Sequence, residues 1–524
     1  MQNVNVSFRE NAFEQNVELI VVGAGACGLI AGLRANSVLR APRALQEHRA
    51  LQEHRALQEH RALQEHRALQ EHSKEAQVLI LERDSSPCGS TSLSSGFIPA
   101  AGTRFQQSDG QSADSADEFA KDIQAKSKGQ SLQSHVQLAC ENIAQAMEWL
   151  ADEYSVPWVV LDDFLYPGHR FHRMHAVPEK TGEALQARLL AAVQQQEIPV
   201  ATESRVTTLY TDTPDTAPAS TGSTTANTVT ANNARITGVE ITRPDGHKES
   251  IGCKALILAC NGYGGNKDMV ERYIPQIASG LYFGHPGNTG DAVVWGEQLN
   301  ADLMHLSGYQ GHGSVAHPHG MLITWALMME GGIQVNLEGQ RFSNEHGGYS
   351  EQAVNVLAQT DQLAWNIYDS RIHHFAKGFP DYVQACDAGA IKTADTINEL
   401  AAKTGVPLVE LANTLEAVDS FRRGDRVDPY GRAFDGDKAL QPPWYAVKVT
   451  GALFHTQGGL VLDDQCRVCK ADGSVFDNLF AGGGAACGVS GPEVSGYLSG
   501  NGLLTAVAFG FVAGGSAAES IRGS

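Results

Sequence analysis

The chain has 524 residues, a formal net charge of −20 and 54 glycines. Its length predicts roughly two or three domains, and 42% apolar with 19% charged residues is typical of a globular protein. No basic stripe offsets the acidic balance. We therefore expect no nucleic-acid partner, because a phosphate backbone is bound mainly through lysine and arginine.

Cysteine usage and hydropathy bear on metal sites and on the cellular compartment. The nine cysteines have no regular spacing, which argues against a disulfide framework. The Cys466–Cys469 pair lacks two further zinc ligands, and His312, His317 and His319 have no carboxylate or thiolate at ligand spacing, so we expect no metal. The polar start has no apolar signal core, and no run of about 18 apolar residues predicts a membrane span. We expect a cytoplasmic protein without membrane contact.

The first predicted elements are two buried parallel strands, at residues 17–22 and 77–81. An alanine- and leucine-rich helix follows the first strand and continues to about Leu39. Between that helix and the second strand lie five perfect copies of Arg-Ala-Leu-Gln-Glu-His, at 43–72. Six residues advance a helix by about 600°, so successive leucines move around its axis and build no apolar stripe. We expect a surface insertion, either a helical hairpin or partly disordered.

The later elements repeat the pattern of a buried strand that ends in glycines. Strand-like segments at 205–210 and 234–242 flank a stretch rich in Thr, Ala, Ser and Pro at 211–233, which predicts a long surface loop. Residues 255–259 and 479–484 are apolar runs that enter glycine-rich turns, and a long Gly/Ala/Leu helix over about 500–518 closes the chain.

A glycine motif at the end of the first strand predicts a dinucleotide site. Gly23, Gly25 and Gly28 follow a strand and open a helix, where glycines permit a tight turn and a close approach to a pyrophosphate. Glu82 ends the second strand, 54 residues after Gly28, and removal of the 30-residue repeat leaves 24. That spacing is close to the usual ~20 residues, so we predict that Glu82 binds the ribose hydroxyls.

Six further segments, in chain order, resemble one flavoprotein family. They are the hydroxyl-rich residues 83–96, LILACNGYG at 256–264, GNTGD at 287–291, GGIQVNLEGQRFSNE at 331–345, TQGGL at 456–460 and LFAGGG at 479–484. The chain is similar to the family of soluble fumarate reductases, tricarballylate dehydrogenases and 3-ketosteroid Δ1-dehydrogenases. The resemblance covers nearly the whole chain except the two low-complexity insertions.

The resemblance implies an α/β fold with a Rossmann-like, glutathione-reductase-type FAD domain and an inserted α+β capping domain. The implied domains are 1–282 (FAD, first part), 283–444 (cap) and 445–524 (FAD, second part). No histidine corresponds to the covalent flavin attachment of membrane-bound relatives, so we expect non-covalent FAD. The predicted FAD ligands are Gly23, Gly25, Ala26, Cys27, Gly28, Glu82, Arg83, Ser90, Thr91, Ser92, Gly96, Val206, Ala259, Asn261, Gly262, Asp291, Gly483, Asn501, Leu503 and Leu504. Gly484 departs from the family's Glu or Asn beside the flavin.

Two departures from the family pattern bear on the substrate. Dicarboxylate-reducing members carry an arginine before the "EGG" segment and another in "RLGGN", where this chain has Met328 and Tyr497. Arginine pairs bidentately with carboxylates, so its loss argues against fumarate or succinate. A tyrosine at 497 and a second one at 349 resemble the ketosteroid dehydrogenases, and His455 occupies a site that binds substrate carboxylate in dicarboxylate reductases.

The resemblance thus implies an enzyme that acts on CH–CH bonds, with Tyr349, Tyr497 and His455 as catalytic residues. Tyr497 would polarise a ketone, Tyr349 would remove an α-proton, and flavin N5 would accept a hydride from the β-carbon. A phenol has a free pKa of ~10, so Tyr349 needs a lowered pKa or a proton relay.

Several alternatives stay open. The substrate is a ketosteroid-like ketone, a smaller cyclic ketone or a 4-oxocyclohexanecarboxylate-like acid. The same chemistry run backwards gives a reductase of an activated alkene, with a separate electron donor or acceptor as partner. A third hypothesis is a flavin-binding protein whose repeat serves as an interaction arm.

Overall fold

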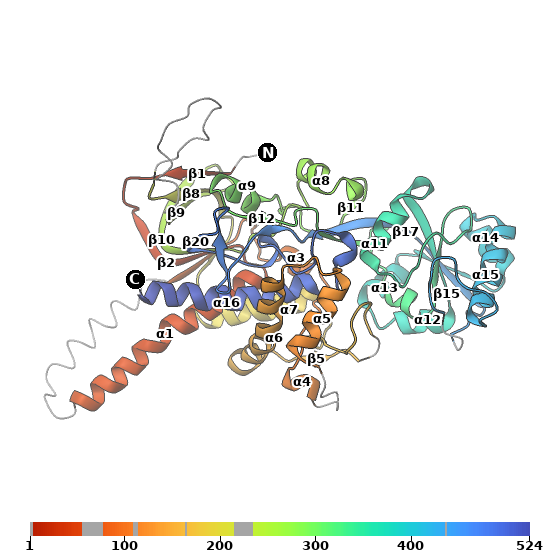
Figure 1. Ribbon diagram of the computed structural model, residues 1–524, viewed down its shortest axis with the longest axis horizontal. Helices are drawn as coiled ribbons and strands as arrows, with labels where there is room; N and C mark the ends of the chain where they lie inside the picture. Colours follow the sequence, from red (N-terminus) through yellow and green to blue (C-terminus); the bar gives the residue numbers. More distant parts are fainter. Residues whose placement is uncertain are drawn as a thin grey trace.

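A computed structural model describes residues 4–54, 77–107, 114–162, 165–213, 234–434 and 438–523 (Figure 1). Its largest element is a nine-stranded sheet with the order β1-β8-β9-β10-β2-β3-β7, to which β20 adds on β10 and β19 on β20. The strands are β1 (Asn5–Phe8), β2 (Gln15–Val22), β3 (Val78–Leu81), β7 (Val200–Ala201), β8 (Arg205–Thr211), β9 (Ile236–Thr242), β10 (Lys248–Leu258), β19 (Arg467–Cys469) and β20 (Val475–Ala481).

The long strand β10 joins the two parts of this sheet. Its first half pairs antiparallel with β9, and its last residues, 256–258, pair parallel with β20. On its other side β10 runs parallel to β2, which in turn runs parallel to β3. The carboxyl ends of β2, β3, β10 and β20 therefore meet at one edge, where α/β sheets bind their ligands.

Two long helices cover one face of the sheet and lie side by side (Figure 1), α1 (Ala26–His54) and α16 (Asn501–Gly523). Glycines allow their close approach, because a Cβ on Gly510 or Gly514 would lie 2.6 or 2.3 Å from a carbonyl oxygen of α1. Helix α16 is long and apolar enough to cross a membrane, but 72% of its most apolar window is buried. It is the core helix of this domain.

Helix α1 extends beyond the predicted end near Leu39 and runs into the repeat as far as His54 (Figure 1). Arg, Ala, Leu, Gln and Glu are all good helix formers, so the repeat continues a helix although it has no face to bury. Residues 55–76, which hold the rest of the repeat, and 214–233, which hold most of the predicted surface loop, lie outside the described residues.

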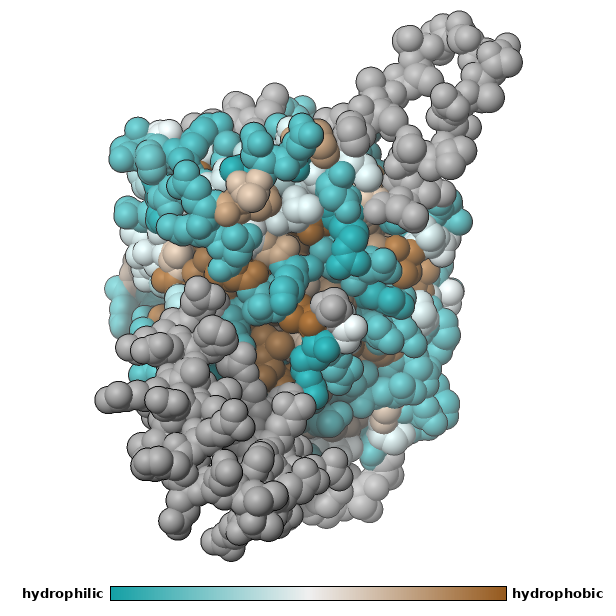
Figure 2. Space-filling model, turned by 90° about the vertical axis from the view of Figure 1, so that its left-hand side faces the viewer, coloured by the Kyte–Doolittle hydropathy of each residue, from teal (hydrophilic) through white to brown (hydrophobic). Residues whose placement is uncertain are grey.

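A helical layer and two small sheets complete this half of the molecule. Helix α6 packs on α16, and α7 on α1. The remaining elements here are α3 (Gly89–Ser92), α4 (Arg104–Gln107), α5 (Ala116–Lys126), α6 (Gln133–Tyr154), α7 (Gly182–Gln195), α8 (Lys267–Tyr273), α9 (Asp291–Gln298), β4 (Ile98–Pro99), β5 (Val159–Val160), β6 (Met174–Ala176), β12 (Leu303–Met304) and β18 (Gly459–Leu460). The face shown in Figure 2 is mainly hydrophilic, with small apolar patches.

A second unit is built on a six-stranded sheet with its own hydrophobic core (Figure 1). Its strands are β11 (Leu281–Tyr282), β13 (Tyr309–Ala316), β14 (Ile333–Val335), β15 (Leu363–Asp369), β16 (Ile391–Ala394) and β17 (Trp444–Thr456). Its helices are α10 (Ala326–Met329), α11 (Tyr349–Leu357), α12 (Ser370–Ala376), α13 (Pro380–Asp387), α14 (Ile397–Thr404) and α15 (Leu408–Arg422). The predicted boundary at 444 falls at the start of β17, which is the central strand of this sheet and returns the chain to the first unit.

Candidate active site

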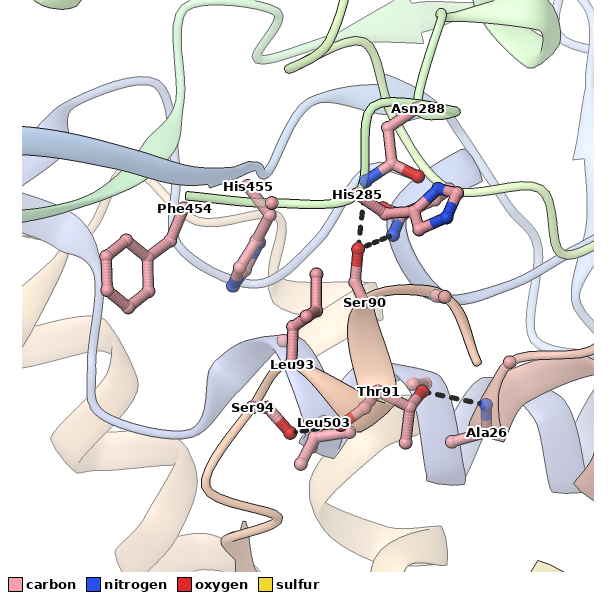
Figure 3. Close-up of a pocket in the computed structure, with 18 of the residues that line it drawn as sticks. Ala26, Ser90, Thr91, Leu93, Ser94, His285, Asn288, Phe454, His455 and Leu503 are labelled. Atoms are coloured by element: carbon pink, nitrogen blue, oxygen red, sulfur yellow. Dashed lines mark hydrogen bonds between the residues drawn. The ribbon is translucent and has the colours of Figure 1, made fainter. Parts of the chain in front are cut away.

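A cavity of about 300 Å³ runs between the two units, at the edge where the sheet strands end. The nine-stranded unit contributes the residues after β2, β3 and β10, and the second unit contributes residues of β13, β17 and α11 and of the loop before α10. Figure 3 shows this region, with Leu93 extending into the space between Ser90 and His455.

The end of the cavity beside α1 has the geometry of a nucleotide cradle. Gly23 has a φ of +106°, and a Cβ there would lie 2.5 Å from the carbonyl oxygen of Ala259. Gly25 lines the cavity, and only the Thr91 hydroxyl lies within 4 Å of a Cβ built on it. The backbone is thus bare where a pyrophosphate approaches a helix N-terminus. Glu82 holds this turn, because its carboxylate accepts the N–H of Ala24 over 2.9 Å.

The hydroxyl-rich segment 83–96 closes the cradle from the side. The Thr91 hydroxyl accepts the N–H of Ala26 over 3.0 Å, at the start of α1. The Ser90 hydroxyl accepts from the side-chain amides of Asn261 and Asn288, both over 2.9 Å (Figure 3). These hydrogen bonds connect segment 83–96 to the start of α1, to the turn after β10 and to the loop before α9. The small hydroxyl residues of the segment therefore hold the local structure together as well as lining the cavity.

Three predicted catalytic residues meet at the other end of the cavity. The rings of Tyr349 and Tyr497 lie 6.2 Å apart between centroids, and those of His455 and Tyr497 lie 5.6 Å apart. All three line the cavity although they come from α11, from β17 and from the loop before α16. The His312 ring stacks on Tyr349 at 4.9 Å and on Phe454 at 5.2 Å, which forms an aromatic wall.

Tyr497 is placed as a hydrogen-bond donor. Burial raises the pKa of its phenol, and hydrogen bonds from the backbone of Gly502 and Gly500 act against that rise. Since these backbone amides bond to the phenol oxygen at the N-terminus of α16, its proton is available to another acceptor.

Of the two conditions under which Tyr349 was expected to act as a base, a lowered pKa or a proton relay, the first is not met. Burial raises the pKa of its phenol well above the usual value, and the neighbouring phenol of Tyr497 raises it further. A hydrogen bond with Ser499 lowers it only in part. Lys126 is paired with Glu351 of α11, and no cation of the described part of the chain is among the groups that shift the pKa of Tyr349. Tyr349 is a neutral phenol at neutral pH.

The two histidines at this end are neutral as well. Burial lowers the pKa of His455 to about 4 and that of His312 to about 3. The side-chain amide of Gln457 donates to Nδ1 of His455 over 3.0 Å. A Cβ on Gly502 would lie 2.7 Å from Nε2 of His455, so glycine at this position makes room for the ring. His455 is therefore an uncharged hydrogen-bonding group and not a cation for a carboxylate.

Comparison with known proteins decides the family. The FAD binding domain family matches residues 67–503. The chain belongs to this family. It is 27% identical to "Probable fumarate reductase Ifc3" of Shewanella frigidimarina over 85% of this chain and 71% of that protein. It is 30% identical to 3-oxosteroid 1-dehydrogenase of Mycobacterium tuberculosis over 50% of this chain and 52% of that protein. The chain spans about half the length of several other relatives, such as 49% of NADH:fumarate oxidoreductase of Klebsiella pneumoniae.

Solved structures show the same fold. The open form of a flavocytochrome c3 fumarate reductase superposes with a TM-score of 0.72 at 24% identity, over 97% of this chain and 79% of that one. The 3-ketosteroid Δ4-(5α)-dehydrogenase of Rhodococcus jostii RHA1 gives 0.69 at 21% identity, over 98% of this chain and 100% of that one. The protein is thus an FAD-dependent oxidoreductase that acts on CH–CH bonds. The predicted family, α/β fold and FAD cofactor are confirmed, whereas the mode of flavin attachment stays a prediction.

The flavoprotein has an internal compensation at Gly484. The family pattern has Glu or Asn at 484, where this chain has Gly484. A Cβ on Gly484 would lie 2.1 Å from Oδ1 of Asn261, so the Asn261 side chain fills the space that a residue at 484 would need. The same asparagine donates to Ser90. A polar side chain thus lines the cavity at this place from a different strand end.

Most predicted FAD ligands line the cavity, but five do not, and these are Gly28, Ser92, Gly262, Asn501 and Leu504. The two glycines are required for close packing, because a Cβ on Gly28 would lie 1.8 Å from Gly23 O and one on Gly262 2.0 Å from the Thr456 hydroxyl. Ser92 bonds back to Cys88, Asn501 donates to Ser490, and Leu504 is in the core.

Several cavity residues were not predicted. They are Ala24, Asp84, Leu93, Ser94, Tyr166, His285, Asn288, Gln310, Trp325, Phe379, Asp381, Phe454, Gln457 and Ser499. Ser94, Asn288 and Gln457 lie inside quoted segments and Phe454 lies near one, so these segments already marked the region of the cavity. Tyr166 and Asp381 lie in segments without a motif, and only tertiary packing brings them to the cavity.

Charge is unevenly distributed along the cavity. Its only lysine or arginine side chains among the described residues are Arg83 and Arg205, both from the FAD domain. Arg83 donates to Gly287 O over 2.5 Å, and Arg205 lies 3.7 Å from the carboxylate of Asp291. The cap side contributes no cationic side chain within the described part of the chain.

Proposed function

We propose that this flavoprotein desaturates the carbon–carbon bond next to the ketone of a neutral cyclic substrate. The observation that carries the proposal is the paired phenols of Tyr349 and Tyr497, which face one cavity from two domains with ring centroids 6.2 Å apart. The similarity to 3-oxosteroid 1-dehydrogenase supports it, since that protein is named for a ketone substrate.

Each phenol has a separate task in this proposal. Tyr497 donates its proton in a hydrogen bond to the substrate carbonyl, and the N-terminus of α16 stabilises the negative charge that develops on that oxygen. This polarisation acidifies the neighbouring C–H. Tyr349 faces the same space and accepts the α-proton once its own proton has been relayed to water through the hydroxyl of Ser499, its hydrogen-bond partner, which releases one proton as it takes up another. Bound FAD supplies the hydride acceptor for the β-carbon.

The charge of the cavity supports a neutral ketone over a keto acid or a dicarboxylate. A buried carboxylate needs a paired cation or several hydrogen-bond donors. Met328 and Tyr497 replace the two arginines of the dicarboxylate pattern, and the imidazole of His455 is uncharged because burial lowers its pKa to about 4. The keto-acid alternative is therefore the weaker one.

The second candidate is reduction of an activated alkene, and one observation favours it. Burial keeps Tyr349 protonated, which is the state that a proton donor to an alkene requires. The similarity to fumarate reductases agrees with this direction. In both directions we propose a separate electron partner and a cytoplasmic location.

The test is an anaerobic titration of the purified holoprotein with cyclic 3- and 4-ketones, followed by the visible flavin spectrum. Bleaching of the oxidised band shows desaturation. A flavin that stays oxidised with every ketone, but whose reduced form is reoxidised by an enone, supports the reductase instead.

Tyr497→Phe tests the carbonyl donor. We expect unchanged FAD content and kcat lower by about 10²-fold, as for loss of an oxyanion donor. Tyr154→Phe is the matched control, because Tyr154 lies outside the cavity lining. Full activity in Tyr497→Phe contradicts the assigned role.

A further inference from the structure

Asp381 is an acidic side chain on the cap side of the substrate cavity that the proposed mechanism does not use. It lies in the first turn of α13, beside Phe379, and is partly buried. Among the described residues its carboxylate has no hydrogen bond or ion pair. Burial alone raises its pKa, so no neighbouring charge stabilises or repels it. It is a carboxylate that faces the cavity and has no partner in the described part of the chain.

The surroundings of Asp381 are uncharged. The other residues of the second-unit sheet and its helices that line the cavity are Gln310, His312, Leu322, Thr324, Trp325, Tyr349, Phe379, Phe454, His455 and Thr456. The titratable members of this set are uncharged, because burial lowers the pKa of His312 to about 3 and that of His455 to about 4 and raises that of Tyr349. A desolvated carboxylate without a partner is unfavourable, and a hydrogen-bond donor on a ligand relieves that penalty. A ligand carboxylate at this place meets like charge instead.

Asp381 also lies apart from the reacting centre. It lies in α13 of the second unit, whereas Tyr497 lies in the loop that precedes α16 of the nine-stranded unit. A ligand whose carbonyl reaches Tyr497 therefore presents a different part of its skeleton to Asp381.

A purely local role for this acid is helix stabilisation. An acidic residue in the first turn of a helix interacts favourably with the helix dipole. That role explains an acid on α13 but not its place in the cavity wall. It also predicts an effect on stability and none on ligand choice, so the two roles are separable by experiment.

We propose that Asp381 is a specificity-determining residue that binds a hydroxyl donor on the end of the substrate remote from the reacting ketone and excludes ketones with a carboxylate there. This inference rests on the proposed ketone chemistry and narrows its substrate class to hydroxy-ketones.

The experiment uses ring ketones that differ only at the remote end. The four-ring pair is a 3-ketosteroid with a 17β-hydroxyl or a 17β-carboxylate, and the one-ring pair is cyclohexanone with a 4-hydroxymethyl or a 4-carboxylate group. Dissociation constants come from the perturbation of the oxidised flavin spectrum, which requires no turnover, and kcat and KM are measured where turnover occurs. Variants are Asp381→Asn and, as the matched control, Asp387→Asn, an exposed acid at the far end of α13 outside the cavity lining.

We expect the wild-type holoenzyme to bind the hydroxyl ligand of at least one pair tenfold or more tightly than its carboxylate. Asp381→Asn reduces that ratio to threefold or less through Kd and KM with little change in kcat, and Asp387→Asn leaves it unchanged. An equal ratio in wild type and Asp381→Asn, or no binding of either pair, overturns the inference. Discrimination in Kd without flavin reduction instead refutes the proposed desaturation and leaves the Asp381 site standing.

Discussion

At the scale of single residues, the pair Asn261 and Gly484 shows how one side chain compensates for another. Asn261 has a φ of 65°, a left-handed conformation that asparagine tolerates better than most residues. Its amide donates to Ser90, and its oxygen fills the space above Gly484. Asn261 therefore supplies a polar side chain at the cavity wall where residue 484 has none.

This compensation predicts a reciprocal effect of two substitutions. Gly484→Asn alone should lower FAD content severalfold, because its Cβ would lie 2.1 Å from Oδ1 of Asn261. Asn261→Gly alone should weaken FAD by about tenfold through loss of hydrogen bonds. The double variant should bind FAD more tightly than either single one, measured as the FAD Kd of the reconstituted protein. Purely additive losses in the double variant contradict the compensation.

At the scale of elements, one ion pair joins α5 of the FAD domain to α11 of the cap. Lys126, the last residue of α5, donates to the carboxylate of Glu351 over 2.7 Å and to Gly347 O over 2.9 Å. Both side chains are mostly buried, with 13% and 24% of their surface exposed. Glu351 is two residues after Tyr349, so this contact fixes the start of α11 where the proposed base lies.

Lys126→Met should therefore lower kcat about tenfold and destabilise the protein by about 1–3 kcal/mol, because it leaves the Glu351 carboxylate without its cation. Lys126→Arg should recover much of the activity. Lys121→Met on the same helix is the control, since its pair with Glu118 is exposed to solvent and contributes little to stability. Thermal unfolding and steady-state kinetics measure both effects, and equal behaviour of the Lys126 and Lys121 variants contradicts the prediction.

At the scale of the whole molecule, buried histidines link stability to pH. Burial lowers the pKa of several histidines. The pKa falls to about 3 for His169 and His312 and to about 4 for His175, His346 and His455. The pKa of His135 is lowered as well. The unfolded chain has a histidine pKa of ~6.5, so below that pH the unfolded state binds more protons and the folded state loses stability. Glu351 and Asp381 have the opposite effect on stability, because burial raises the pKa of their carboxyl groups and the folded state then binds protons more readily than the unfolded state. These two carboxyls are outnumbered by the histidines.

The free energy of unfolding should therefore be fully retained above pH 6.5 and should fall as the pH drops from 6.5 toward about 4. Each fully buried histidine contributes on the order of 2–3 kcal/mol to this loss. Thermal unfolding of the holoprotein at half-unit pH steps, with FAD content measured at each step, checks this. A midpoint that is constant or rises from pH 6.5 to 4.5 contradicts the linkage.

The geometry of the nucleotide-binding end of the cavity could be predicted from the sequence, because the residues that determine it lie in successive elements of the chain. The tight turn at Gly23, the bare backbone at Gly25 and the carboxylate of Glu82 at a strand end are specified by neighbours within one βαβ unit. The same locality explains why the strands at 15–22 and 78–81 were predicted closely, while α1 ended 15 residues beyond the predicted Leu39. Nothing in a run of good helix formers marks a stop.

The substrate half was decided by tertiary structure. The resemblance to the family predicted Tyr349, Tyr497 and His455 as catalytic residues. Their protonation states, however, depend on which side chains exclude water around them. Burial raises the pKa of Tyr349, so that of the two expected conditions, a lowered pKa or a proton relay, only the relay is left. Asp381 reaches the cavity only because α13 packs on the cap sheet. Short-range pattern fixes backbone geometry, whereas desolvation is a property of residues distant in sequence and close in space.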